Sequence, residues 1–155
     1  MTQYSVYAIG AALVDTEIQV NDSELVAMAV EKGVMTLVDE GRQAELMGHL
    51  QGHLVGASHA SGGSAGNSMI ATALFGAPTF MSCKVADDAD GDIYLADLEA
   101  SGVAHSLTDK RGSGTTGKCL VLITPDAERS MNTFLGVSET LSTAEVDDQA
   151  IATSD

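Results

Sequence analysis

A turn of small residues at positions 61–67, with the sequence SGGSAGN, is the feature that most restricts how this chain can fold. An extended run at residues 53–61 leads into the turn, and a strongly apolar run at residues 68–75 follows it. The pair Gly62 and Gly63 permits backbone angles and close approaches that a Cβ atom would prevent. The pattern therefore predicts a strand, a tight turn and a buried helix, which together begin an α/β unit.

Extended and helical runs alternate on both sides of this turn. Apolar or β-branched runs predict strands at residues 4–9, 35–38, 79–85, 103–107, 118–124 and 130–135. Capping residues, apolar spacing and terminal glycines predict helices at residues 24–33, 39–50, 68–75 and 93–100. Strands separated by helices are typical of a largely parallel sheet, and the turn at Pro125–Asp126 predicts one hairpin that projects from it.

Composition favours one compact domain and excludes some partners. The chain has 155 residues, 45% of them hydrophobic, which is enough to bury one sizeable core. It carries 22 acidic and 7 basic residues, for a net charge of −15. Because such a surface repels phosphate backbones and anionic lipid, we expect no nucleic acid and no membrane as a partner. Residues 1–10 lack the pattern of a signal peptide, so we expect a cytoplasmic protein.

The cysteines and the metal-like patterns are expected to be structural. Cys83 and Cys119 each lie in an apolar run without a CxxC pair, which predicts buried thiols. Glu45, His49 and His53 are spaced four residues apart, as metal ligands on one helix face would be. Nearby glycines weaken that helix and no second motif supports a site. We therefore expect a solvent-facing stripe and no metal.

The segment GSGTTGKC at residues 112–119 is one residue short of a phosphate-binding P-loop. Cys119 stands where a Ser or Thr should hold Mg²⁺, and the run that follows is typical of a strand. A P-loop precedes a helix. A P-loop nucleotidase is therefore a remote alternative, which the element after Lys118 can decide.

The chemistry of the turn at residues 61–67 leaves two interpretations open. The start of a helix presents unpaired N–H groups, and the amide of Asn67 can both donate and accept hydrogen bonds. Such a set suits a ligand with many hydroxyl groups. The alternative is a plain connection between a strand and a helix.

Residues 60–92, with the sequence ASGGSAGNSMIATALFGAPTFMSCKVADDADGD, resemble the first signature of the PfkB family of carbohydrate and nucleoside kinases. Further landmarks of the family follow the same order along nearly the whole chain: Gly10 with Asp15, ADLEASGVAHS at 96–106, Thr116–Gly117, and TPDAERSM at 124–131. The form of the turn is most similar to the adenosine kinase branch.

The resemblance implies a ribokinase-like α/β fold with a small β-sheet lid. The core would be a mostly parallel sheet flanked by helices, here incomplete. Its segments would be residues 1–10, 39–111 and 135–155. The lid would comprise residues 11–20, 34–38 and 112–134.

The resemblance also implies substrate-binding roles for matched residues. Asp15 would accept hydrogen bonds from substrate hydroxyls, Gly62 and Gly63 would offer their backbone to the sugar, and Asn67 would bind a hydroxyl. Arg129 is a candidate phosphate contact when the lid closes, with a solvated hairpin residue as the alternative.

The catalytic motif of the family does not occur in this sequence. The family uses a Gly-x-Gly-Asp turn, whereas the single Gly-x-Gly here, at residues 112–114, is followed by Thr115. The resemblance therefore implies the N-terminal, substrate-binding part of an ATP-dependent kinase that phosphorylates a hydroxyl of a sugar or nucleoside. We expect the ATP and Mg sites in a C-terminal part, and this stretch alone to be inactive.

The function class, the substrate and the oligomeric state stay open. A non-catalytic sugar- or nucleoside-binding module would use the same residues, and sugars and nucleosides share the hydroxyl-binding pattern. Dimerisation through the lid is also an open alternative. Residues 144–155 supply no element that closes the sheet, so we expect the native protein to continue and the last part of the chain to leave a β-edge unpaired.

Overall fold

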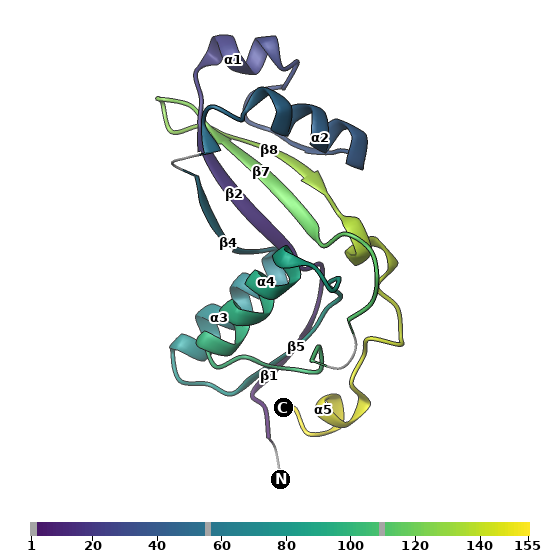
Figure 1. Ribbon diagram of the computed structural model, residues 1–155. Coiled ribbons are helices and arrows are strands. Elements are labelled where there is room, and N and C mark those ends of the chain that lie inside the picture. The colour runs from purple at the N-terminus through teal and green to yellow at the C-terminus, as the bar shows by residue number, and fades with distance from the viewer. Residues whose placement is uncertain (1–2, 55–56, 109–110) are drawn as a thin grey trace. The chain divides into compact units, whose positions relative to one another are not determined.

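The computed structural model describes residues 3–54, 57–108 and 111–155, and it divides into two compact units (Figure 1). The first unit comprises Met1–Val14, Ala60–Gly117 and Gly136–Asp155. The second unit comprises Asp15–His59 and Lys118–Leu135. The assignment of segments to a kinase core and a lid stays a prediction.

The elements alternate along the chain much as the sequence pattern indicates. The strands are β1 (Val6–Ile9), β2 (Leu13–Gln19), β3 (Met35–Leu37), β4 (Ser58–Gly62), β5 (Thr79–Ser82), β6 (Ala104–His105), β7 (Gly117–Ile123) and β8 (Arg129–Phe134). The helices are α1 (Asp22–Ala27), α2 (Glu40–His49), α3 (Ser64–Leu74), α4 (Ala89–Ala100), α5 (Asp148–Ala152) and the 3₁₀ helix η2 (Gly136–Thr140). Within the described ranges, none of the helices has the length and apolar character needed to cross a membrane.

The first unit contains a parallel sheet with the strand order β1-β5-β6. Helices α3 and α4 lie side by side in this unit (Figure 1), and the side chain of Tyr94 on α4 lies against Gly66 on α3. Their apolar residues share one core with the sheet. Its buried members are Ala12, Val14, Met69, Met81, Cys83, Val85, Tyr94, Leu98, Val103 and Leu107. The predicted α/β architecture with parallel strands is thus confirmed.

The second sheet has the strand order β3-β8-β7-β2-β4. Strands β7 and β8 form the antiparallel hairpin that Pro125–Asp126 predicted, and β3 pairs with β8 in parallel. Strands β2 and β4 each continue from one unit into the other. Helices α1 and α2 contribute to a core in the second unit, whose buried members are Ile18, Val20, Leu25, Met28, Leu46, Leu50, Leu120 and Leu122.

Three helix boundaries differ from those predicted. The helix expected at 24–33 ends at Ala27, because the backbone turns left-handed at Ala29, with φ of 51°. Helix α3 begins at Ser64, four residues before its apolar run. Helix α4 begins at Ala89, because the carboxylate of Asp88 accepts a hydrogen bond from Gly91 N–H at 2.8 Å and caps it.

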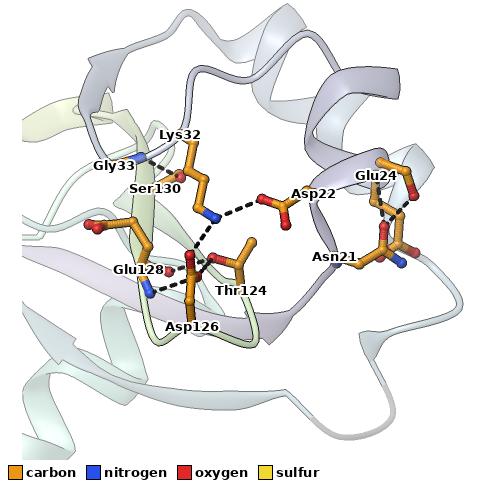
Figure 2. A network of polar contacts seen from close by, with 10 residues as sticks. Asn21, Asp22, Glu24, Lys32, Gly33, Thr124, Asp126, Glu128 and Ser130 are labelled. Carbon is orange, nitrogen blue, oxygen red and sulfur yellow. Dashed lines mark hydrogen bonds and ion pairs between the residues drawn. The ribbon is translucent and has the colours of Figure 1, made fainter.

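Lys32 joins two segments of the second unit that are far apart in the sequence (Figure 2). Its Nζ lies 2.7 Å from Oδ1 of Asp22, in the first turn of α1, and 2.7 Å from Oδ2 of Asp126, at the hairpin tip. Asp126 also accepts a hydrogen bond from the hydroxyl of Thr124 at 2.6 Å. The hydrogen bond from Lys32 is the largest cause that lowers the pKa of Asp126. The single ammonium thus offsets two carboxylates in a strongly acidic chain.

We expect Lys32→Met to lower the midpoint of unfolding, and to do so more at low salt than at high salt. The reason is that an exposed ion pair is screened by added ions. Lys32→Arg should retain most of the effect, because it keeps the charge. Chemical unfolding at two salt concentrations measures the difference. An equal loss at both concentrations would show that the ion pairs contribute nothing.

His105 on β6, in the first unit, has an almost buried side chain. Its side chain is 8% exposed, its Nδ1 accepts a hydrogen bond from Leu107 N–H at 3.3 Å, and its Nε2 lies 3.7 Å from Glu99 Oε1. Burial lowers the pKa of His105, and the carboxylate of Glu99 opposes this shift only in part. The folded protein therefore favours the neutral ring.

We expect the free energy of unfolding to decrease as the pH falls below 6.5, the ordinary pKa of this side chain. The unfolded chain binds the proton at a higher pH than the folded chain does, so acidification favours unfolding. His105→Asn keeps an acceptor for Leu107 N–H and removes the titration. Its unfolding free energy should vary less between about pH 7.5 and about pH 5. Identical pH profiles for the two proteins would contradict the assignment.

Candidate functional site

The candidate site in the first unit lies where parallel strands end. Strand β1 ends at Ile9, and Gly10 N–H donates to Ser82 O at 3.3 Å, at the end of β5. Open α/β sheets bind ligands outside the carboxyl ends of their strands. The segment after β1 is therefore a candidate binding surface.

The Gly62–Gly63 turn packs against this segment. Gly62 is the last residue of β4, and Gly63 precedes the first residue of α3. Gly63 has φ of +88°, and a Cβ atom there would lie 2.6 Å from the carbonyl oxygen of Ala11. A Cβ atom on Gly10 would in turn lie 2.6 Å from the Cβ of Ala65. Both approaches require glycine, so the turn and the strand end form one continuous backbone surface.

The start of α3 lacks a side-chain cap. Helices α1, α2, α4 and α5 are each capped by an Asn or Asp side chain, whereas Gly63 has none to offer. Asn67 lies in the first turn, is exposed, and uses its backbone N–H for Gly63 O at 3.0 Å. Among the residues that the structure describes, none forms a hydrogen bond with the amide side chain of Asn67. The helix start thus offers backbone donors and one free amide.

Asp15 lies on β2 in the second unit and is half-buried. Burial raises the pKa of its carboxyl group, and the negative charge of Glu17 raises it further. The charge of Asp15 also contributes to the raised pKa of Cys119, on β7. Ile18 on β2 shares a core with Leu120 on β7, and side chains alternate along a strand, so Asp15 and Cys119 both lie on the other side of the second sheet. The structure assigns Asp15 to one unit and Gly62, Gly63 and Asn67 to the other, so their shared role in binding stays a prediction.

Arg129 is the first residue of β8, in the second unit. Its side chain is 63% exposed, and Nη2 lies 3.9 Å from Glu17 Oε1. The guanidinium is therefore accessible to solvent and only loosely paired. Its predicted contact with phosphate remains a prediction.

The P-loop interpretation of residues 112–119 is wrong. Strand β7, and not a helix, begins at Gly117. The hydroxyl of buried Thr116 donates to Asp88 Oδ1 at 2.6 Å, and its N–H donates to Asp88 Oδ2 at 2.9 Å. The polar groups of Thr116 in this loop therefore bond to Asp88, the residue that caps α4.

The sequence patterns that resembled metal ligands have other partners. Glu45 Oε2 lies 2.9 Å from Arg42 Nη1, and His53 Nε2 lies 2.9 Å from Glu24 Oε1. In residues 3–54, 57–108 and 111–155, no cluster of three or more His, Cys, Asp or Glu side chains is placed to hold a metal ion.

Both thiols are buried, as the sequence predicted. Burial raises the pKa of Cys83 to about 12, against an opposing hydrogen bond with Tyr94. Burial likewise raises the pKa of Cys119. Neither thiol is suited to act as a nucleophile at neutral pH.

Sequence reasoning missed the residues that hold the turn. Asp97 on α4 accepts a hydrogen bond from Ser61 N–H at 2.7 Å, and the hydroxyl of buried Ser138 bonds to the backbone of Ala12. Asp97 lies 36 residues from its partner and Ser138 lies 126 residues away. No local pattern in one sequence signals contacts of this kind.

We expect Gly63→Ala to destabilise the protein by at least about 1–3 kcal/mol, the usual cost of one strained backbone position. The clash with the carbonyl of Ala11 adds to that cost. Gly48→Ala is the matched control, because it lies within α2 with no atom within 4 Å of its added Cβ. That change should stabilise the protein by about 0.5–1 kcal/mol. Denaturant unfolding of both variants measures the change in unfolding free energy. Equal changes in the two variants would refute the close approach at Gly63.

The sequence matches the profile of the pfkB family carbohydrate kinases over residues 39–155. A comparison with curated proteins gives no match.

Solved structures of kinases are similar to this chain. A probable sugar kinase from Rhizobium etli CFN 42 is 35% identical, with a TM-score of 0.88, over 99% of this chain and 46% of that one. Adenosine kinase from Sinorhizobium meliloti is 36% identical, with a TM-score of 0.88, over 98% of this chain and 45% of that one. Adenosine kinase from Schistosoma mansoni, in complex with adenosine, is 20% identical, with a TM-score of 0.82, over 97% and 44% of the two chains. The predicted ribokinase-like fold class is thereby confirmed, and the chain spans less than half the length of these structures.

Proposed function

Because this chain belongs to the pfkB family of carbohydrate kinases, we propose that it is the substrate-binding part of an ATP-dependent kinase. The acceptor is a hydroxyl group of a sugar or nucleoside. The single observation that carries this proposal is the Gly62–Gly63 turn at the uncapped start of α3, pressed against the segment after β1. A surface of free backbone donors and one amide suits a neutral molecule with several hydroxyls.

Each matched residue has a distinct task in this proposal. The backbone of Gly62 and Gly63 approaches the substrate closely, and Asn67 both donates to and accepts from its hydroxyls. Asp15 accepts hydrogen bonds from further hydroxyls, which orients the acceptor. Partial burial strengthens such bonds, because little water competes for the carboxylate. Arg129 contacts phosphate oxygens.

The chemistry needs groups that this chain does not supply. An acceptor oxygen bonds to the terminal phosphorus of ATP, the bond from that phosphorus to the bridging oxygen breaks, and the hydroxyl proton passes to a base. The family's Gly-x-Gly-Asp turn provides that base, and the sequence of this chain has no such turn. We therefore propose that the residues for ATP, Mg²⁺ and proton transfer lie in a further part of the protein.

One face of the second sheet favours a nucleoside over a simple sugar. The register places Leu37, Thr133 and Cys119 side by side on three strands, and Asp15 lies on the same side as Cys119. The neighbouring row contains Met35 beside Met131. Leu37 and Met35 are 60% and 55% exposed. Apolar side chains on the same face of the sheet as a carboxylate suit a molecule with a flat base and a hydroxylated ring.

A non-catalytic binding module is the second candidate, because the sequence lacks the family's Gly-x-Gly-Asp turn. A dimer formed through the exposed edge strand β3 is compatible with either function.

The deciding experiment supplies the full-length protein with ATP and a panel of nucleosides and sugars, and follows ADP release and the phosphorylated product. We expect turnover of adenosine or a related nucleoside. Tight binding of a panel member without any turnover would favour the binding module.

We expect Asp15→Asn in the full-length enzyme to raise the KM for the acceptor by tens- to about a hundred-fold, the size expected for a lost charged hydrogen bond. The value of kcat should fall less. Glu31→Gln is the control, because it removes an exposed carboxylate elsewhere in the second unit. A loss of kcat by many orders of magnitude at unchanged KM would instead make Asp15 the base.

A further inference from the structure

The Gly62–Gly63 turn is held from one side by Asp97. This residue lies on α4, is half-buried, and its Oδ2 accepts a hydrogen bond from Ser61 N–H at 2.7 Å. Ser61 directly precedes Gly62, so the bond holds the peptide group between Ala60 and Ser61, next to the turn. A carboxylate acceptor makes a shorter and stronger bond than a neutral one. Asp97 is therefore the side chain that anchors this end of β4, beside its pairing with β2.

Ser138 holds the segment on which the other side of the turn packs. It lies on η2 and is 7% exposed. Its Oγ accepts from Ala12 N–H at 3.1 Å, and its hydroxyl proton faces the carbonyl oxygens of Ala12 at 2.9 Å and Lys84 at 3.0 Å. These bonds fix Ala12. The residue before it, Ala11, has the carbonyl oxygen that leaves no room for a Cβ atom on Gly63.

We propose that Asp97 and Ser138 are positioning residues for the acceptor substrate, acting through the backbone of the turn. The inference rests on the proposed function, because it takes the turn as the substrate-binding surface. Backbone donors that bind a substrate must lie within a fraction of an ångström of their place to be effective. Asp97 and Ser138 fix the turn and the segment against which it packs, and all of these residues lie in the first unit.

The test compares Asp97→Ala with Asp97→Asn in the full-length protein. The Asn side chain keeps an acceptor for Ser61 N–H, and the Ala side chain does not. Glu99→Gln is the control, since it alters a carboxylate on the same helix that faces His105 instead of Ser61. The measurements are amide hydrogen exchange of a peptide covering residues 58–67, and KM and kcat for the acceptor.

We expect Asp97→Ala to speed exchange in residues 58–67 and to raise KM about tenfold or more, the size expected for a lost bond to a charged group. The value of kcat should change less, and Asp97→Asn should recover most of both losses. Ser138→Ala, a smaller change, should shift exchange and KM in the same direction, and it provides the test if Asp97→Ala does not fold.

The outcomes separate this inference from the function on which it rests. Unchanged exchange and KM in Asp97→Ala and Ser138→Ala would overturn the positioning role, as would an Asp97→Asn protein as defective as Asp97→Ala. If the wild type phosphorylates no acceptor, the proposed kinase function fails, and the exchange measurement still shows whether these side chains hold the turn.

Discussion

The close approach of Gly63 to the carbonyl oxygen of Ala11 is the contact on which the rest of the candidate site depends. It joins the segment after β1 to the start of α3 in a space that no Cβ atom can enter. The absence of a side chain at Gly63 also leaves the first turn of α3 without a cap. One residue therefore provides both the tight packing and the unpaired N–H groups that a hydroxylated ligand could use.

Local signals in the sequence predicted much of the fold. The apolar run at residues 79–85 contains β5, and Pro125–Asp126 lies in the turn of the β7–β8 hairpin. Asp39 caps α2 through a hydrogen bond from Arg42 N–H at 2.8 Å. In each case the decisive interaction lies within a few residues of the pattern, so a single sequence contains it.

Tertiary contacts determine the features of the structure that the sequence did not predict. Helix α1 stops early because the chain turns at Ala29 and brings Gly33 N–H to the hydroxyl of Ser130, 97 residues away. Asp97 and Ser138 were missed for the same reason, since their partners lie far along the chain. By contrast, Gly62, Gly63 and Asn67 were singled out because glycine at a strand–helix turn has a local physical meaning.

The central claim is that residues of this chain bind the acceptor substrate of a kinase. The most direct test is a titration of the full-length, ¹⁵N-labelled protein with adenosine in the absence of ATP, followed by amide chemical shifts. The account predicts that the amides of Gly62, Gly63, Asn67 and Asp15 shift together and saturate at one adenosine concentration. Saturable shifts confined to other residues, or no shifts with any nucleoside or sugar of the panel, would contradict it.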